Sequence, residues 1–499
     1  MYKGLKSSNL KSWSLIVLSS ILLTTSMPGY SLSPLVFIAL VPLFVAIYID
    51  SKNIYLKVLI FSLIFYMSSL RWLITTVSHY GGAPIYISLI ILFIFSLYLS
   101  VYWLLFIYFY KKLNNKIVLS TIFVVLEIIR GTFLTGFPWL NLAQSQFNNI
   151  YILKITSVFG EYGLSFIIFI TNLFLADYFM KNQLKPLLIG FVIPSLTMFC
   201  GYLMITLCNP SKELLNVTVI QPVYEQRLKW DVKSSNMIIN YNRTLIDKAL
   251  KENTDLLILP EAVFPTFLEL HKDLYEYLLN VSYKKPLLFG NIRMDFINNK
   301  YFNSIFFINN GEIDIYDKIH LVPFGEYFPL QNLFKPIKYY FFGDSDAFSR
   351  GTLIHAFQLK KIIFAALICY EGAYTGLVQQ FMKKQPDFIA INTNDSWFGN
   401  SIGRFQHLAI ATLRASETST FIVRAAQSGI SACIGPDGKL LNYLDVNEEG
   451  IFNCTISKAK FNSIFNKLQY SWLVVLILAI AYYYLKIVFQ KKKIAKKGN

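Results

Sequence analysis

Long apolar segments alternate with short basic ones over the first two hundred residues of the chain, and the pattern returns at its end. Eight apolar stretches approach the roughly 20 residues that a helix needs to cross a bilayer: 12–28, 33–49, 55–77, 84–110, 117–136, 151–177, 186–208 and 469–489. The first has the length of a secretory signal, but no small-residue cleavage site follows it and further apolar segments come at once. The pattern predicts a polytopic helical membrane protein with eight spans.

Residues 212–460 follow a different pattern, in which charges return and the apolar runs shorten to strand length. Such runs include "NVTVIQPV" (216–223) and "DFIAINTND" (387–395), and amphipathic helical stretches lie between some of them. Continuous short apolar runs are typical of the buried strands of an α/β fold. We therefore predict a transmembrane domain over 1–211 with seven spans, an α/β domain over 212–460, and an eighth span with a basic tail over 461–499.

The net charge of +17 has a simple origin in the loops between spans. Sixteen lysines lie in alternate loops and at the two ends, with only Asp50 and Asp177 beside them, whereas loops such as "SHYGGAP" (78–84) carry almost no charge. Because basic loops stay in the cytoplasm, both termini are predicted to be cytoplasmic and the α/β domain to lie outside. The same distribution argues against nucleic acid as a partner.

Cysteine and histidine do not indicate a metal site. The five cysteines are too few and too scattered for a disulfide framework or a zinc site, and the five histidines show no ligand spacing. We interpret Cys433 and Cys454 as packing residues of strand-like stretches, and we predict neither a metal nor a cofactor.

Five charged residues inside or near the predicted spans need an explanation. Glu127 and Arg130 are three residues apart, so one helix face would pair them. Arg71 and Lys154 lie near span ends, where we expect their side chains to snorkel to the interface. Glu161 would hold the sixth span against the α/β domain.

Three reactive side chains come just after strand-like runs, where α/β folds gather their chemistry. Glu261 ends "LLILPE", Lys318 follows "GEIDIYD" and Cys369 ends "AALIC". A carboxylate would take the proton of the thiol, and an ammonium with the backbone N–H of Tyr370 would stabilise an oxyanion. Spacing alone leaves the ordinary alternatives open: a turn acid, a surface lysine and a buried core thiol.

The sequence motifs around these residues resemble those of a known family. "LPEAVFP" (259–265), "YDKIHLVPFGEYFP" (316–329) and "ICYEGAY" (368–374) resemble the catalytic blocks of the nitrilase, or carbon–nitrogen hydrolase, superfamily. "HLVPFGEYFP" together with eight spans resembles, more narrowly, the apolipoprotein N-acyltransferases of bacterial inner membranes. Five further blocks fit the same family: "RGTFLTGFPWL" (130–140), "GEYGLSF" (160–166), "LKWD" (228–231), "NDSWFG" (394–399) and "RAAQSGISACIGPDG" (424–438).

The resemblance implies an αββα sandwich and a role for each matched residue. It makes Glu261 the general base, Lys318 the oxyanion support and Cys369 the nucleophile that carries a thioester. In supporting roles it implies that Glu326 orients Lys318, that Tyr370 and Glu371 line the site, and that Trp230 and Trp397 contact substrate.

The resemblance also implies the reaction and its partners. A membrane phospholipid would donate an acyl chain to the thiol, and the thioester would acylate the amino group of a diacylated apolipoprotein in a ping-pong scheme. The aromatic stretch "LQNLFKPIKYYFFGD" (330–344) would either dip into the membrane interface or pack on the domain.

The same sequence features are compatible with two other functions. A membrane-tethered amidase acting on small amides would need the same three residues but not the membrane motifs. A scaffold or transporter with an inactive outer domain would not need an intact Glu–Lys–Cys set, and the chain shows no internal repeat of the transporter type.

Overall fold

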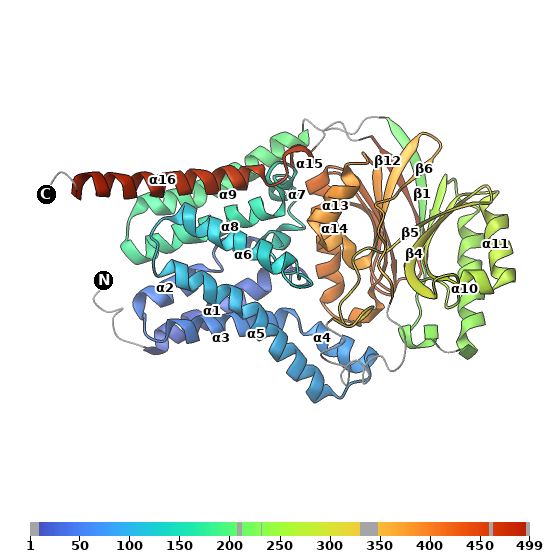
Figure 1. Ribbon diagram of the computed structural model, residues 1–499, viewed down its shortest axis with the longest axis horizontal. Helices are drawn as coiled ribbons and strands as arrows, with labels where there is room; N and C mark the ends of the chain where they lie inside the picture. Colours follow the sequence, from blue (N-terminus) through green and yellow to red (C-terminus); the bar gives the residue numbers. More distant parts are fainter. Residues whose placement is uncertain (1–8, 207–211, 231, 330–347, 459–462, 496–499) are drawn as a thin grey trace.

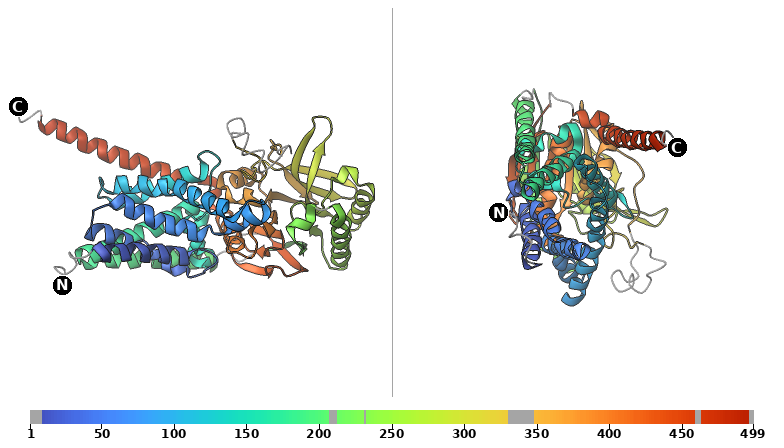
Figure 2. Two further views of the ribbon diagram at one scale, coloured as in Figure 1. Left: turned by 90° about the horizontal axis from the view of Figure 1, so that it is seen from below. Right: turned by 90° about the vertical axis from the view of Figure 1, so that its left-hand side faces the viewer.

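The computed structural model describes residues 9–206, 212–230, 232–329, 348–458 and 463–495. A helical region and an α/β domain lie end to end along the long axis of the molecule (Figure 1). The C-terminal helix α16 (Ser471–Ala495) leaves the α/β domain and runs beside the helical region, so that both chain ends lie at the far end of that region (Figures 1 and 2).

Apolar helices build the region predicted to be membrane-embedded. Besides α16 they are α1 (Asn9–Ser26), α2 (Val41–Ile49), α3 (Ile54–Ser69), α4 (Trp72–Thr75), α5 (Ile85–Tyr110), α6 (Lys116–Thr132), α7 (Ile150–Leu153), α8 (Thr156–Lys181) and α9 (Leu184–Thr206). Within the described residues α5, α8 and α9 are long and apolar enough to cross a membrane, and α3 with its bent continuation to Tyr80 would be a fourth. The count of eight spans stays a prediction.

Serines explain why α1 is less apolar than a simple span. Ser12 Oγ donates to the Ala46 carbonyl at 3.1 Å, and Ser19 Oγ donates to the Ala39 carbonyl at 2.6 Å. Small hydroxyl residues let helices approach closely in an apolar region. The hydroxyls of α1 are therefore used for packing against the segment that contains α2.

The α/β domain consists of two six-stranded sheets. One has the order β12-β1-β2-β3-β4-β5 and the other β11-β10-β9-β8-β7-β6. Their strands are β1 (Glu213–Gln221), β2 (Leu256–Ile258), β3 (Leu287–Asp295), β4 (Lys300–Asn309), β5 (Glu312–Asp317), β6 (Ala356–Leu359), β7 (Ile362–Ile368), β8 (Phe388–Asn394), β9 (Phe421–Gln427), β10 (Ser431–Ile434), β11 (Leu440–Leu444) and β12 (Gly450–Ser457). The central strands of each sheet are parallel, an arrangement for which continuous apolar runs are typical.

Helices cover the outer face of each sheet. Side chains of both sheets, such as Val217 and Phe364, share one buried core between them. Helices α10 (Val232–Ala249) and α11 (Lys272–Ser282) pack outside the first sheet, and α13 (Thr375–Met382) and α14 (Gly403–Thr418) lie between the second sheet and the helical region (Figure 1). The four layers agree with the predicted αββα sandwich.

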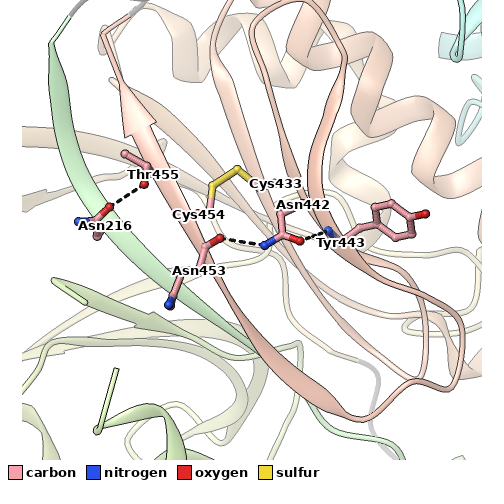
Figure 3. The surroundings of a disulfide bond; sticks show 7 residues. All are labelled: Asn216, Cys433, Asn442, Tyr443, Asn453, Cys454 and Thr455. Carbon is pink, nitrogen blue, oxygen red and sulfur yellow. Dashed lines mark hydrogen bonds between the residues drawn. A yellow bond between two sulfur atoms is a disulfide. The ribbon is translucent and has the colours of Figure 1, made fainter. Parts of the chain in front are cut away.

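A disulfide bond corrects one prediction. Cys433 on β10 and Cys454 on β12 are bonded, although we interpreted both as packing residues (Figure 3). The two strands belong to different sheets, so the bond ties the sheets together. Their Cα atoms are 5.7 Å apart, within the usual range for a disulfide, and this proximity depends on sheet packing rather than on spacing along the chain.

Buried charges connect the helical region to the α/β domain. The Glu161 carboxylate on α8 pairs with Arg414 on α14, and the Glu161 backbone N–H donates to Glu417 Oε1 at 2.8 Å. Arg414 pairs with Glu417 as well. Glu161 therefore contacts the α/β domain as predicted.

Two other expectations about charges near the spans are wrong. Lys154 does not snorkel: it is 2% exposed, and its ammonium donates to Ser419 Oγ at 3.0 Å and to the Pro436 carbonyl at 2.9 Å. Arg130 is hydrogen-bonded to Tyr66 and Asn141, with no ion pair to Glu127. In both cases a neighbouring segment, which helix periodicity does not reveal, supplies the partner.

Candidate active site

Three sequence-predicted residues meet at the carboxyl ends of strands from both sheets. Glu261 lies in the turn after β2, Lys318 directly follows β5, and Cys369 directly follows β7. Lys318 Nζ lies 3.5 Å from Glu261 Oε1, and the charges of both act on the Cys369 thiol. The structure thus places a base, a cation and a thiol in one buried cluster.

The Glu261 carboxylate is held at both oxygens. Its Oε1 accepts from Asn303 Nδ2 at 2.7 Å, and its Oε2 accepts from the backbone N–H of Asn394 at 2.9 Å. The side chain is almost buried. Hydrogen bonds of this kind fix the orientation of a carboxylate without neutralising it, so Glu261 is positioned to accept a proton.

Gly290 on β3 makes room for the turn that carries Glu261. A Cβ at this position would lie 2.6 Å from Glu261 Cα, which no real contact allows. Two hydrogen bonds tie the strand to the turn: Gly290 N donates to the Pro260 carbonyl, and Val263 N donates to the Gly290 carbonyl, each at 2.9 Å. Gly290 is therefore required for the position of Glu261, and the sequence alone did not identify it.

Glu326 is the second carboxylate beside Lys318. Its Oε1 accepts from Lys318 Nζ at 2.8 Å and from Asn303 Nδ2 at 2.7 Å, while its Oε2 accepts from the Val322 N–H at 2.7 Å. Burial alone would lower the pKa of Lys318, but Glu326 and Glu261 outweigh it and hold that pKa above its ordinary value. Lys318 is therefore a permanent cation.

The backbone at Cys369 turns sharply. Cys369 has φ +52°, between the end of β7 and a short 3-10 helix, η7 (Cys369–Ala373). A positive φ costs free energy in a residue with a Cβ, and here it places the thiol at the tip of a strand-to-helix elbow. The backbone N–H groups of η7 that follow are typical donors for an oxyanion.

Glu371 holds this elbow in place. It is fully buried, and its Oε2 accepts from the Ile368 N–H at 2.9 Å. Its Oε1 accepts from the N–H groups of Ile319 (2.8 Å) and His320 (3.0 Å) and from the Tyr316 hydroxyl (2.8 Å). Glu371 thus connects the Cys369 elbow to the segment that carries Lys318, and it shapes the site from behind.

The Cys369 thiol is protonated in the resting protein. Burial is the main cause that raises its pKa above the ordinary value, and the Glu261 carboxylate adds to it, whereas Lys318 and a hydrogen bond with Thr393 oppose the rise. Because the thiolate is the nucleophile, this cysteine needs a base at the moment of reaction. Glu261 is the carboxylate placed to act as this base.

A buried charge cluster behind Cys369 was not predicted. His407 Nδ1 lies 2.9 Å from Asp395 Oδ1, and Arg424 donates to Asp395 Oδ2 at 2.7 Å. The other ring nitrogen of His407 lies 3.4 Å from the Cys369 carbonyl. Asp395 and Arg424 come from blocks that matched the family pattern and His407 lies between these blocks, but their separation in sequence hides the contact.

The loop after α6 reaches the site from the helical region. The hydroxyls of Tyr370 and Tyr374 donate to the Gly136 carbonyl at 3.4 and 3.1 Å. Trp139 Nε1 donates to Gln406 Oε1 at 2.8 Å, beside His407 on α14. The "GFPWL" motif of the membrane region therefore packs directly against the segment of the nucleophile.

The structure describes the side chain of only one of the two tryptophans that were predicted to contact substrate. Trp397 lies on η8 (Asp395–Phe398), is 39% exposed, and its ring contacts that of Tyr80. The side chain of Trp230, at the end of η5 (Gln226–Trp230), and the aromatic stretch 330–344 lie outside the described part of the chain. Substrate contact by either tryptophan stays a prediction.

Lys229 is a buried lysine beside the site that the sequence did not single out. It is 1% exposed, and its ammonium donates to Gln427 Oε1 at 2.9 Å. Burial lowers the pKa of Lys229 to about 7, against the opposing charge of Glu261. This position titrates in the physiological range, unlike Lys318.

The depressed pKa of Lys229 predicts a pH-dependent stability. Between pH 7 and 10.5 the unfolded chain holds the proton that the folded protein has lost, so the free energy of unfolding rises with pH. The slope from one such group is at most about 1.4 kcal/mol per pH unit. Thermal unfolding of Lys229→Met from pH 7 to 10 should lack this rise, whereas the exposed Lys233→Met should keep it. Parallel profiles for Lys229→Met and the wild type would contradict the prediction.

Comparisons with known proteins agree with this architecture. A model of the carbon–nitrogen hydrolase family matches residues 239–463, and a model of the apolipoprotein N-acyltransferase N-terminal domain matches residues 19–174. The two-sheet fold and the family match thus define a carbon–nitrogen hydrolase domain joined to a region of apolar helices. Both family models match in the order that the resemblance implies, so the chain is similar to apolipoprotein N-acyltransferases along most of its length.

Individual relatives span most of the chain. An apolipoprotein N-acyltransferase of Haemophilus influenzae is 29% identical over 447 residues, covering 85% of each chain, and one of Geobacter metallireducens is 28% identical, covering 92% of this chain and 91% of the relative. Among solved structures, Nit3 of Saccharomyces cerevisiae, a member of the nitrilase superfamily, is 18% identical with a TM-score of 0.40, covering 52% of this chain and 96% of Nit3.

Proposed function

We propose that the protein transfers a fatty acyl chain from a membrane phospholipid, through a thioester on Cys369, to the N-terminal amino group of a diacylglyceryl-cysteine apolipoprotein. The observation that carries the proposal is the Glu261–Lys318–Cys369 cluster, with its two charged groups buried, on the side of the α/β domain that contacts the helical region. A site in this position receives substrates from the bilayer.

The first stage forms the thioester. Glu261 removes the proton of the Cys369 thiol, and the thiolate attacks an ester carbonyl of the phospholipid. Lys318 and the backbone N–H of Tyr370 stabilise the oxyanion of the tetrahedral intermediate. The C–O bond then breaks, the proton on Glu261 passes to the departing alkoxide, and a lysophospholipid leaves.

The second stage transfers the acyl group to nitrogen. The free amine of the apolipoprotein attacks the thioester carbonyl, and Glu261 takes a proton from the attacking nitrogen. When the C–S bond breaks, this proton returns to the thiolate, so that the thiol is restored and an amide is released.

The proposal includes the arrangement in the membrane. It comprises a membrane domain over 1–211, an extracytoplasmic catalytic domain over 212–460 and an eighth span with a cytoplasmic tail over 461–499, in the inner membrane of a bacterium. Both ends of the described chain lie on the same side, which supports an even number of spans (Figure 1). The Cys433–Cys454 disulfide supports an oxidising compartment for the catalytic domain.

Mass spectrometry of the intact protein tests the donor stage. After incubation with a defined phospholipid, we expect one added acyl mass that maps to the peptide of Cys369 and disappears when a diacylated lipopeptide is added. Acylation of Cys369 by a small amide, followed by hydrolysis of the thioester by water and no transfer to the lipopeptide, would instead favour a tethered amidase. A Cys369 that stays unlabelled with phospholipid alone would contradict the proposal.

A further inference from the structure

A cavity of about 220 Å³ lies where the loop after α6 meets the catalytic domain. The helical region and the catalytic domain both contribute to its wall, through Thr132, Thr135, His320, Tyr327, Arg350 and Tyr374. One water needs only about 10–15 Å³ by the same measure, so the cavity has ample room for a polar head group.

The cavity has one cation and no acid in its wall. The Arg350 guanidinium lies 4.8 Å above the Tyr327 ring, and among the residues that the structure describes no carboxylate forms an ion pair with it. Burial, with Arg350 and Lys318 nearby, lowers the pKa of His320 to about 4, so this histidine is neutral at physiological pH. The net positive charge comes from Arg350 and favours an anion.

The cavity is one layer of side chains away from the nucleophile. The His320 ring stacks on Tyr374 with 3.5 Å between centroids, and Tyr374 contacts the Tyr370 ring at 5.0 Å. Tyr370 directly follows Cys369 in the chain. In a glycerophospholipid the phosphate and the acyl esters are separated only by the glycerol backbone, so a lipid with its ester at Cys369 carries its phosphate into this neighbourhood.

We propose that this cavity is the subsite for the phosphate of the acyl donor, with Arg350 as the residue that binds it. The inference rests on the proposed function and adds a specificity-determining residue to it. A guanidinium binds two phosphate oxygens at once, and the Tyr327 ring beneath Arg350 limits its orientations. The donor would therefore be selected by its phosphodiester, in addition to its acyl chains.

The test compares two donors with the same acyl esters. Full-length wild-type protein and Arg350→Gln, in a neutral detergent, are given either phosphatidylethanolamine or the matching diacylglycerol, and thioester formation is followed by mass spectrometry. We expect Arg350→Gln to lose about ten- to a hundredfold in kcat/KM with the phospholipid, mainly through KM, and to be unchanged with diacylglycerol. Arg350→Lys should recover part of the loss, because it keeps the charge but not the paired contact.

A matched control uses another arginine that stacks on a tyrosine. Arg243 on α10 also lies 4.8 Å above a ring, that of Tyr277, but it pairs with Asp273 on the outer face of the domain. Arg243→Gln should behave as the wild type with both donors. An equal loss of Arg350→Gln on both donors, or no loss on either, would overturn the subsite.

A third arm separates a lipid phosphate from a free one. If millimolar inorganic phosphate inhibits the wild type while Arg350→Gln keeps the wild-type preference for phospholipid over diacylglycerol, the cavity takes a free anion and the proposal is wrong. A wild-type protein that forms no thioester with either donor would overturn the proposed function and this inference together. If the wild type is acylated and Arg350→Gln forms the thioester with the same kinetics as the wild type on both donors, the inference alone is overturned.

Discussion

Cys369→Ser should abolish acyl transfer while leaving the protein folded and inserted. The serine hydroxyl has almost the size of the thiol but a far higher pKa, so Glu261 would not generate the nucleophile at neutral pH. We expect the rate of lipopeptide acylation to fall by at least about a thousandfold, with no added acyl mass on the protein. Gel-shift or mass analysis of the lipopeptide measures the first effect, and intact mass measures the second.

The chain offers a matched control for this substitution. Cys200 on α9 is the other free cysteine among the described residues, and it lies away from the catalytic cluster. Cys200→Ser should retain the activity and the thermal unfolding midpoint of the wild type. Triacylated product from Cys369→Ser at a rate near that of Cys200→Ser would rule out a thioester mechanism.

Arg414→Met should destabilise the contact between the helical region and the catalytic domain. The Arg414 side chain is 1% exposed and pairs with Glu161 and Glu417, both 0% exposed. Removal of the cation leaves two buried carboxylates facing each other, and breaking a buried pair in this way costs about 3–5 kcal/mol. Thermal unfolding in detergent should show the loss, and transfer should fall with it because the same helix carries Gln406 and His407.

Two controls test this prediction: substitution of a second arginine on α14, and a variant that lacks Arg414 together with its two carboxylate partners. Arg404 is also buried, but its hydrogen bond goes to the neutral Asn447, so Arg404→Met should cost much less than Arg414→Met. Replacing both carboxylates by Gln in the Arg414→Met background should restore part of the stability, because no charge is then left unpaired. Equal effects of the two arginine substitutions would show that charge pairing is not the cause.

Local patterns were sufficient to predict an α/β fold for the catalytic domain and to place Glu261, Lys318 and Cys369 just after strands, whereas the four layers were implied only by the resemblance. Continuous apolar runs indicate buried strands, and residues just after such strands share one edge of a sheet, so these positions follow from the chain itself. The roles of these residues came from the resemblance, since the same spacing also fits a turn acid, a surface lysine and a core thiol.

Contacts between distant segments were not predictable in this way. Gly290 lies beneath Glu261 because two parallel strands are neighbours, and His407 reaches the Cys369 carbonyl from a helix on the outer layer. Cys433 finds Cys454 across two sheets, and Lys154 finds its partners in the catalytic domain. Each of these contacts depends on how folded helices and strands pack against one another. Neither the hydrophobic periodicity of a segment nor the spacing of residues along the chain contains that information.

The raised pKa of the Cys369 thiol has a consequence for maturation of the enzyme itself. In the proposed oxidising compartment the catalytic domain would expose three cysteines to thiol oxidants, yet only Cys433 and Cys454 are joined. Disulfide exchange and sulfenic acid formation both proceed through the thiolate. Desolvation and the Glu261 charge raise the pKa of Cys369 and keep its sulfur in the thiol form, so this partly exposed nucleophile reacts slowly with oxidants and stays reduced until an ester arrives.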